Sequence, residues 1–274
     1  MTSKEAQYLG CVEFEGWDYQ EAPPADVADL RYLQSQKPWL ALCCILERAK
    51  SGEFSAVHLL PSLARNNPGL LADTAHFLLA CVGSMEDLQI LEHEILREDG
   101  DRMTAADCAV QSGSLQFLGS FIAGHRVAFG ETTRMAMEEG LSNLLLSDPE
   151  SNKVIECLTA DRRDEGEEEL RAMARTQRAT FGDKASMYRG RPLTLGAIID
   201  DIEPILHGRD EQDFAYLRSL MTRVQTMAGF SQQELFDEET QSWNELAIRK
   251  TLKAAKQLQG VPGMRYFFGH PVPL

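Results

Sequence analysis

The chain has 274 residues, of which 43% are hydrophobic and 25% charged, and its formal net charge at pH 7 is −15. This composition is that of a folded protein, and the length suffices for one large domain or two ordinary ones. No run of 18 apolar residues occurs and the start lacks the apolar core of a secretion signal, so we expect a cytoplasmic protein with no membrane contact.

The negative charge is concentrated in the first half of the chain. Residues 1–150 contain 10 Lys and Arg against 23 Asp and Glu, whereas residues 151–274 contain 17 against 19. Such a field repels nucleic-acid phosphates and anionic membrane surfaces, and it accelerates encounter with a basic protein. We therefore expect a basic protein partner and no nucleic acid.

The N-terminal residues predict an arm. Residues 7–24 are rich in acidic and aromatic side chains, among them Glu13, Glu15, Trp17 and Asp18. The segment forms either a strand or cap over the first helix, or an arm that contacts a partner. The four named residues are candidate partner contacts on the second interpretation.

Helical periodicity follows the arm. Apolar residues recur from Asp26 through Lys50, and Gly52 then provides a helix stop. A second helix is expected over residues 53–65, in which Pro61 either produces a kink or marks the true start.

The strongest pattern is an internal repeat between about residues 67 and 147. Gly83 and Gly113, 30 positions apart, each separate a helix of small residues from a more apolar helix, and a degraded third copy has Gly140 in the same place. A period of this length is typical of helix-pair solenoids, in which each repeat buries its face against its neighbours. The repeat therefore predicts a binding surface.

The rest of the chain predicts a junction and further helices. Between residues 159 and 192 charges are dense and large apolar residues are few, which predicts a solvated helix and a loop. Helical periodicity then returns, and the apolar tail is expected to pack back onto the fold. The predicted parts are an N-terminal arm, a helical-repeat region, a charged junction and a C-terminal helical region, at residues 1–24, 25–158, 159–192 and 193–274.

A family resemblance supports this fold. The run from Glu98 to Ala106, in which an Asp-Arg pair precedes two alanines, resembles the short HEAT-like repeats of the phycobilisome-lyase type. The resemblance covers roughly residues 53–147 and implies an all-α fold of antiparallel helix pairs in a curved solenoid. An ankyrin repeat is the alternative, because Thr104 to Gly113 falls near its spacing, but the usual Thr-Pro-Leu-His run is missing.

Motifs of enzymes, cofactor sites and metal sites are missing from the sequence. It contains no GxGxxG, P-loop or GxSxG sequence, and no CxxC or HExxH. Asp200, Asp201 and Glu203 form a carboxylate cluster, which the polar edge of an amphipathic helix explains without catalysis. The six cysteines are expected to be reduced core thiols. We expect no catalytic residue, no metal and no cofactor.

An acidic patch is the best-supported candidate site. If residues 85–98 form a helix, Leu91 and Leu96 face the core and the acids project on the opposite side. The patch offers carboxylates to the Lys or Arg side chains of a partner, although a well-solvated helix would look the same. Its predicted members are Asp87, Glu94, Glu98, Asp99 and Asp101.

These features lead to two functional hypotheses. The first is a non-enzymatic binding protein of the bacterial immunity type, whose acidic helices occlude a cationic toxin domain such as a nuclease. It rests on analogy with acidic all-α inhibitors of basic toxins. The second is a HEAT-like adaptor or scaffold subunit, in which the acidity only maintains solubility.

Overall fold

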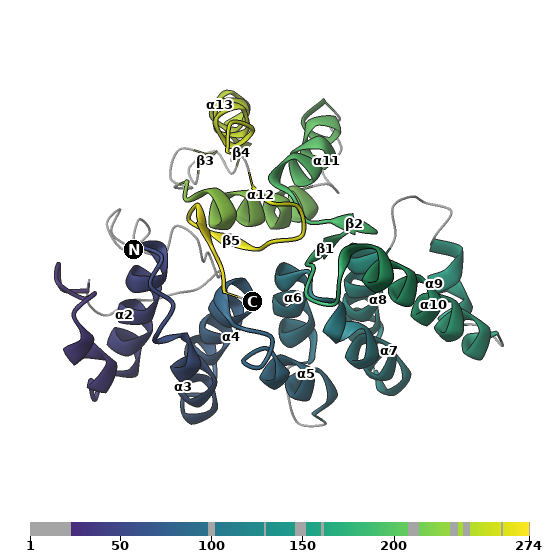
Figure 1. Cartoon of the computed structure of the whole chain (residues 1–274), viewed down its shortest axis with the longest axis horizontal. Coiled ribbons are helices and arrows are strands. Elements are labelled where there is room, and N and C mark those ends of the chain that lie inside the picture. The colour runs from purple at the N-terminus through teal and green to yellow at the C-terminus, as the bar shows by residue number, and fades with distance from the viewer. Residues whose placement is uncertain are drawn as a thin grey trace. The chain divides into compact units, whose positions relative to one another are not determined.

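The computed structural model describes residues 23–97, 102–128, 130–145, 152–159, 162–207, 214–230, 235–237, 242–258 and 260–273. Over these residues the chain is mostly helical, which confirms the predicted helical class, and it contains three short two-stranded hairpins (Figure 1). None of the described helices is both long enough and apolar enough to cross a membrane.

The chain divides into two compact units. Unit 1 is Met1–Val82, Leu195–Gly260 and Tyr266–Pro273, and unit 2 is Gly83–Thr194 with Val261–Arg265 and Leu274. This division passes between the two glycine-separated helices of the first predicted repeat.

Unit 1 contains helices from both ends of the sequence. Its second helix has Pro38 in the first turn and buries nearly all of its circumference, from Ala41 through Leu46 and again at Ala49. Helix α3 packs on α4, and α11 packs on α12. Its described elements are η1 (Leu30–Gln34), α2 (Pro38–Lys50), η2 (Val57–Leu59), α3 (Leu60–Asn66), α4 (Leu70–Val82), α11 (Leu195–His207), α12 (Phe214–Ala228), β3 (Phe236–Asp237), β4 (Ser242–Trp243), α13 (Glu245–Ala255), β5 (Tyr266–Phe267) and β6 (His270–Pro271).

Unit 2 is built from consecutive helices that pack in pairs. Helix α5 packs on α6, α7 on α8 and α9 on α10, while α5 also contacts α7 and α6 contacts α8. Small buried residues on α6, such as Ala105, Ala106 and Ala109, allow these helices to approach closely. Its elements are α5 (Gln89–Leu96), α6 (Arg102–Ser112), η3 (Leu115–Phe117), α7 (Leu118–Val127), α8 (Glu131–Leu145), α9 (Asn152–Thr159), α10 (Arg163–Phe181), β1 (Met187–Tyr188) and β2 (Arg191–Pro192).

The structure corrects several predicted helix boundaries. The helix expected from Asp26 begins as the short η1, and α2 starts only at Pro38. Pro61 marks the start of α3 instead of kinking a longer helix. Gly140, expected to separate two helices, lies inside α8, where an added Cβ would stand 2.7 Å from the Phe121 ring. This glycine allows close packing and does not end a helix.

The predicted charged junction is more ordered than its composition suggests. Helix α10 buries Glu167 and Leu170, and β1 buries Tyr188 completely. A helix is therefore present where one was expected, and most of its charged side chains are exposed, but its buried residues and β1 contribute to the core of unit 2. The C-terminal tail does pack back on the fold, as predicted, with Phe267 and Val272 buried.

Two β-hairpins, one in each unit, share one construction. Strands β1 and β2 pair Met187 with Pro192, and strands β5 and β6 pair Tyr266 with Pro271 in the same register. Each hairpin turns through two residues with positive φ, of which the second is glycine, as a type I′ turn requires. The pair in each turn is Arg189 and Gly190, or Phe268 and Gly269.

Each of these turns also closes the C-terminal end of a 15-residue helix. The amides of Arg189 and Gly190 donate to the carbonyls of Asn143 (2.6 Å) and Leu144 (3.2 Å), near the end of α8. The amides of Phe268 and Gly269 donate to the carbonyls of Thr226 (2.8 Å) and Met227 (2.8 Å), in the equivalent positions of α12. Both turns thus satisfy carbonyls that a helix end leaves without an intrahelical donor.

Candidate functional site

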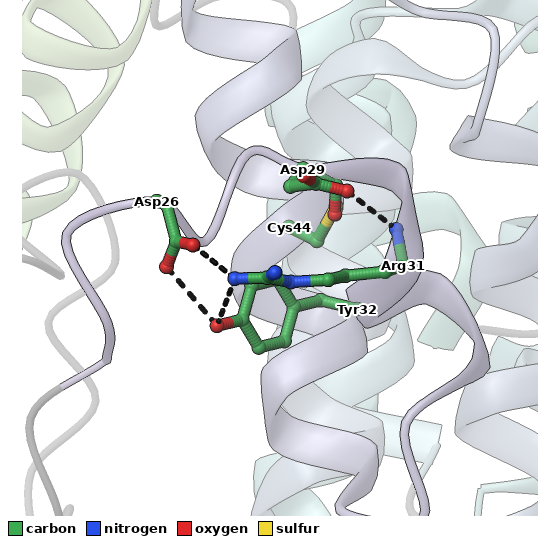
Figure 2. Close-up of polar contacts among 5 residues, drawn as sticks. All are labelled: Asp26, Asp29, Arg31, Tyr32 and Cys44. Atoms are coloured by element: carbon green, nitrogen blue, oxygen red, sulfur yellow. Dashed lines mark hydrogen bonds and ion pairs between the residues drawn. The ribbon is translucent and has the colours of Figure 1, made fainter.

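An exposed polar cluster lies at the beginning of the described part of unit 1 (Figure 2). The side chain of Asp29 caps η1 by accepting from the Arg31 amide at 2.9 Å. The Arg31 guanidinium forms an ion pair with Asp26 and lies over the Tyr32 ring, 4.9 Å from its centroid. The Tyr32 hydroxyl donates to the second Asp26 oxygen at 3.0 Å. One carboxylate therefore holds a stacked Arg-Tyr pair in place.

The chemistry of this cluster is that of a contact surface. The hydrogen bond with Tyr32 and the charge of Asp26 raise the pKa of Arg31, so its guanidinium stays charged. Arg and Tyr are residue types enriched in protein interfaces. Nearby, burial raises the pKa of the Cys44 thiol, whose Sγ lies 3.4 Å from the Asp29 carbonyl oxygen. That shift disfavours the thiolate and so argues against a nucleophilic cysteine.

Two members of the predicted acidic patch have local structural partners in unit 2. The Asp87 carboxylate accepts from the Ser84 amide at 2.9 Å and from its hydroxyl at 2.7 Å, which stabilises the turn that leads into α5. The Glu94 carboxylate is only 16% exposed and accepts from Arg97 at 2.9 Å. Their part in partner binding stays a prediction, but neither carboxylate is without a local contact.

The other predicted contacts lie outside the described residues. Asp99, Asp101 and Glu98 precede α6 in the sequence. Glu13, Glu15, Trp17 and Asp18 belong to the predicted arm. The described chain begins at residue 23, within the last two residues of the predicted arm and three residues before Asp26 of the exposed cluster.

The arginines of the acidic segment contact groups of unit 2 itself. Residues 83–150 contain 13 Asp and Glu against four Lys and Arg, and all four are arginines. Arg97 pairs with Glu94, and Arg102 is buried against main-chain carbonyls. Arg126 binds Glu167 through two hydrogen bonds of 2.5 and 2.7 Å. Three of the four arginines thus face internal groups.

Sequence reasoning missed an exposed apolar row at one edge of unit 2. Leu96, expected in the core, is 42% exposed at the end of α5. Val127 ends α7 and is also exposed, as are Met103 and Met135 near the starts of α6 and α8. An apolar residue at a helix end continues the periodic pattern, so the sequence carries no signal that it lies beyond the packed face.

The described residues give no separate support to the catalytic alternatives. Glu203 forms an ion pair of 2.5 Å with Lys256, which fits the polar helix edge expected for this carboxylate cluster. Within the part of the chain that the structure describes, no group of three or more His, Cys, Asp or Glu could hold a metal ion.

Comparisons with protein-family models, with curated proteins and with solved structures found no match for this chain. The fold and its surfaces define a mostly helical protein with repeat-like helix pairs. The features that bear on its function are the exposed polar cluster of unit 1, the exposed apolar row of unit 2 and the charge around them.

Proposed function

We propose that the chain is a non-enzymatic binding protein whose acidic helices in unit 2 bind a basic protein partner. In its most specific form the partner is a cationic toxin domain, such as a nuclease, and the chain is the immunity protein that occludes it. The HEAT-like arrangement of the helix pairs in a curved solenoid belongs to this proposal. Such an arrangement would present the acids along one continuous surface.

The internal use of the arginines is the observation that supports the proposal most. On a surface with more acidic than basic side chains, ion pairs between the two kinds normally neutralise part of the negative charge. In residues 83–150, three of only four basic side chains are occupied by Glu94, by main-chain carbonyls and by Glu167. The negative electrostatic field of the remaining acids is therefore not neutralised. This field steers a partner of opposite charge and disfavours acidic competitors.

A binding measurement with the basic products of neighbouring genes tests the proposal. We expect a complex at about 50 mM salt that weakens strongly at about 300 mM, where exposed charges are screened within a few ångströms. Neutralising two exposed acids of the segment, in the variant E86Q/E131Q, is expected to weaken the complex and to flatten its salt dependence. Isothermal titration calorimetry measures both effects.

The matched control lies on α10 in the same unit. Glu165 and Glu168 are each 66% exposed, but they pair with Arg162 and Arg175. The variant E165Q/E168Q therefore alters acids that local arginines already compensate, and it should leave binding nearly unchanged. Equal binding by the wild type and both variants at both salt concentrations would refute the proposal.

An adaptor or scaffold subunit is the second candidate function. It is favoured by the exposed Asp26–Arg31–Tyr32 cluster of unit 1, which offers a contact surface of mixed charge that does not belong to the acidic segment. An adaptor of this kind binds its partner with little salt dependence. Partner binding that survives the E86Q/E131Q neutralisation but is lost in Tyr32→Ala would therefore favour the adaptor.

A further inference from the structure

The exposed apolar row of unit 2 has a defined position in the fold. Leu96 and Val127 are the last residues of α5 and α7, two helices that contact each other. The guanidinium of Arg102 donates to the Val127 carbonyl at 2.9 Å and to the Leu96 carbonyl at 3.4 Å. One buried side chain therefore holds both helix ends together at the same edge.

The two methionines extend this row onto the neighbouring helices. Met103 follows Arg102 in the first turn of α6, and Met135 lies in the second turn of α8, which packs on both α6 and α7. Their exposed fractions are 37% and 60%. All four residues thus lie at or near the last residues of α5 and α7 and the first turns of α6 and α8.

The concentration of apolar side chains at this edge is unusual. Among the described residues of unit 2, the large hydrophobic side chains that are exposed are Leu96, Met103, Val127, Met135, Phe181 and Val261. Four of these six belong to the row. Single exposed apolar residues are ordinary, whereas a group of them indicates a contact surface. Methionine suits such a surface because its side chain adapts to different partners.

The charged groups around the row indicate the charge of the segment that binds there. The C-termini of α5 and α7, whose carbonyls Arg102 binds, and the N-termini of α6 and α8 all lie near this edge, so the excess of acids in residues 83–150, 13 Asp and Glu against four arginines, sets the charge around the row. Glu131 begins α8 and is exposed. Of the basic residues near the row, Arg97 pairs with Glu94, Arg102 is buried against carbonyls, and Arg134 lies beside Met135 in the first turn of α8. An occupant with apolar side chains flanked by Lys or Arg satisfies both the exposed apolar groups and the surrounding acids.

We infer that this edge, formed by Leu96, Met103, Val127 and Met135, docks an amphipathic basic helix of a protein partner. The helix places apolar residues at intervals of three and four against the row, with Lys or Arg on either side facing the acids of unit 2. This inference rests on the proposed function, because it specifies which part of the acidic unit the basic partner contacts and by what kind of segment.

A peptide-binding experiment on the full chain tests the inference. The probe is a synthetic helical peptide of Leu and Lys with one apolar face, compared with a scrambled peptide of the same composition that has no such face. Fluorescence anisotropy is expected to show tighter binding of the amphipathic peptide. The variant M103Q/M135Q should weaken that binding about tenfold, and it should leave binding of the scrambled peptide unchanged.

Phe181→Gln provides the control. Phe181 is 44% exposed in the same unit but ends α10, outside the row. This variant should bind both peptides like the wild type, and thermal unfolding should show that all variants fold. Two results would overturn the inference: equal binding of the two peptides by the wild type, or unchanged amphipathic binding in M103Q/M135Q.

The same experiment separates the inference from the proposed function. Salt-sensitive binding of both Lys-containing peptides, with no effect of the methionine substitutions, would retain the acidic surface as the binding site and reject the apolar row. Failure of the chain to bind either peptide at low salt would reject both. Weakening by M103Q/M135Q alone, with F181Q unchanged, supports both.

Discussion

The two turn-capping hairpins differ most at their glycines. Gly190 in unit 2 has φ of 77°, and an added Cβ would stand 2.7 Å from the Leu145 main-chain carbonyl oxygen. Gly269 in unit 1 has φ of 80°, but no atom lies within 4 Å of the equivalent position. In both units, the conformation of the turn requires the glycine. Only in unit 2 does the close approach of the turn to a helix require it as well.

The same local motif is thus stabilised by different surroundings in the two units. Hairpin β1–β2 presses against the end of α8 and buries Tyr188 and Met187 completely. In hairpin β5–β6 the turn residue Phe268 contacts the Phe267 ring, and the ammonium group of Lys50 lies 5.3 Å from the centre of the Phe268 ring. Backbone geometry is shared, whereas the packing that stabilises it is particular to each unit.

Substituting the two glycines should lower the free energy of unfolding by different amounts. Gly190→Ala forces a left-handed conformation on alanine and a collision with a main-chain oxygen, so we expect a loss of about 3 kcal/mol in the free energy of unfolding. Gly269→Ala meets only the conformational cost, about 1 kcal/mol. Urea denaturation of the two variants measures the difference, and equal losses would contradict the role assigned to Leu145.

The second prediction compares an ion pair in each unit. Glu167 is 5% exposed in its side chain and binds Arg126 through two short hydrogen bonds, whereas Glu203 is 47% exposed in its pair with Lys256. Removing a buried charged acceptor is costly, so Glu167→Gln should lower the stability by about 2 kcal/mol.

The matched substitution Glu203→Gln should change the stability by at most about 1 kcal/mol, because water replaces the partner of an exposed ion pair. Thermal unfolding in low and high salt distinguishes the two, since salt screens the exposed pair more than the buried one. A larger effect for Glu203 would show that unit 1 depends on its ion pairs more than unit 2 does.

The third and smallest effect concerns Glu92, in unit 2. Burial raises its pKa above the ordinary value of 4.5, while the hydrogen bond from Gln116 acts in the opposite direction. Because the pKa is higher in the folded state, ionisation of this carboxyl costs stability as the pH rises through the folded-state value. Below the unfolded-state pKa the carboxyl is protonated in both states and the cost is absent.

Glu92→Gln should therefore increase the free energy of unfolding at about pH 7, by less than about 1 kcal/mol for a half-buried group. The gain should disappear at about pH 3.5. Urea denaturation at the two pH values checks this, with Glu86→Gln, an exposed neighbour, as the control. A gain of equal size at both pH values would show that removal of the charge is not its cause.

Much of the helical fold follows from local pattern. The spacing of Leu217, Leu220, Met221 and Val224 predicts α12 nearly to its ends, because one face of a helix recurs every three or four residues. The acidity of the repeat half is likewise fixed by composition. Helix ends and turns were predicted less well, since the pattern does not distinguish the packed Gly140 from Gly113, which ends α6 with φ of 63°.

The candidate surfaces required tertiary information. Glu167 lies in a segment that was expected to be solvated. Its burial depends on Arg126, which lies 41 residues earlier. That Leu96 is exposed depends on where α5 ends and on what Arg102 binds. Neither contact has a signal in the sequence, because partners so far apart are chosen by the packing of whole helices.

Helical periodicity and charge are properties of neighbouring residues, so the sequence alone establishes that the protein is mostly helical and that its first half is acidic. Only the tertiary structure decided which arginines serve internal groups, which apolar residues stay exposed and which helix ends the hairpins close. These depend on contacts between Gly190 and Leu144, or Gly269 and Met227, that form only when distant segments pack together.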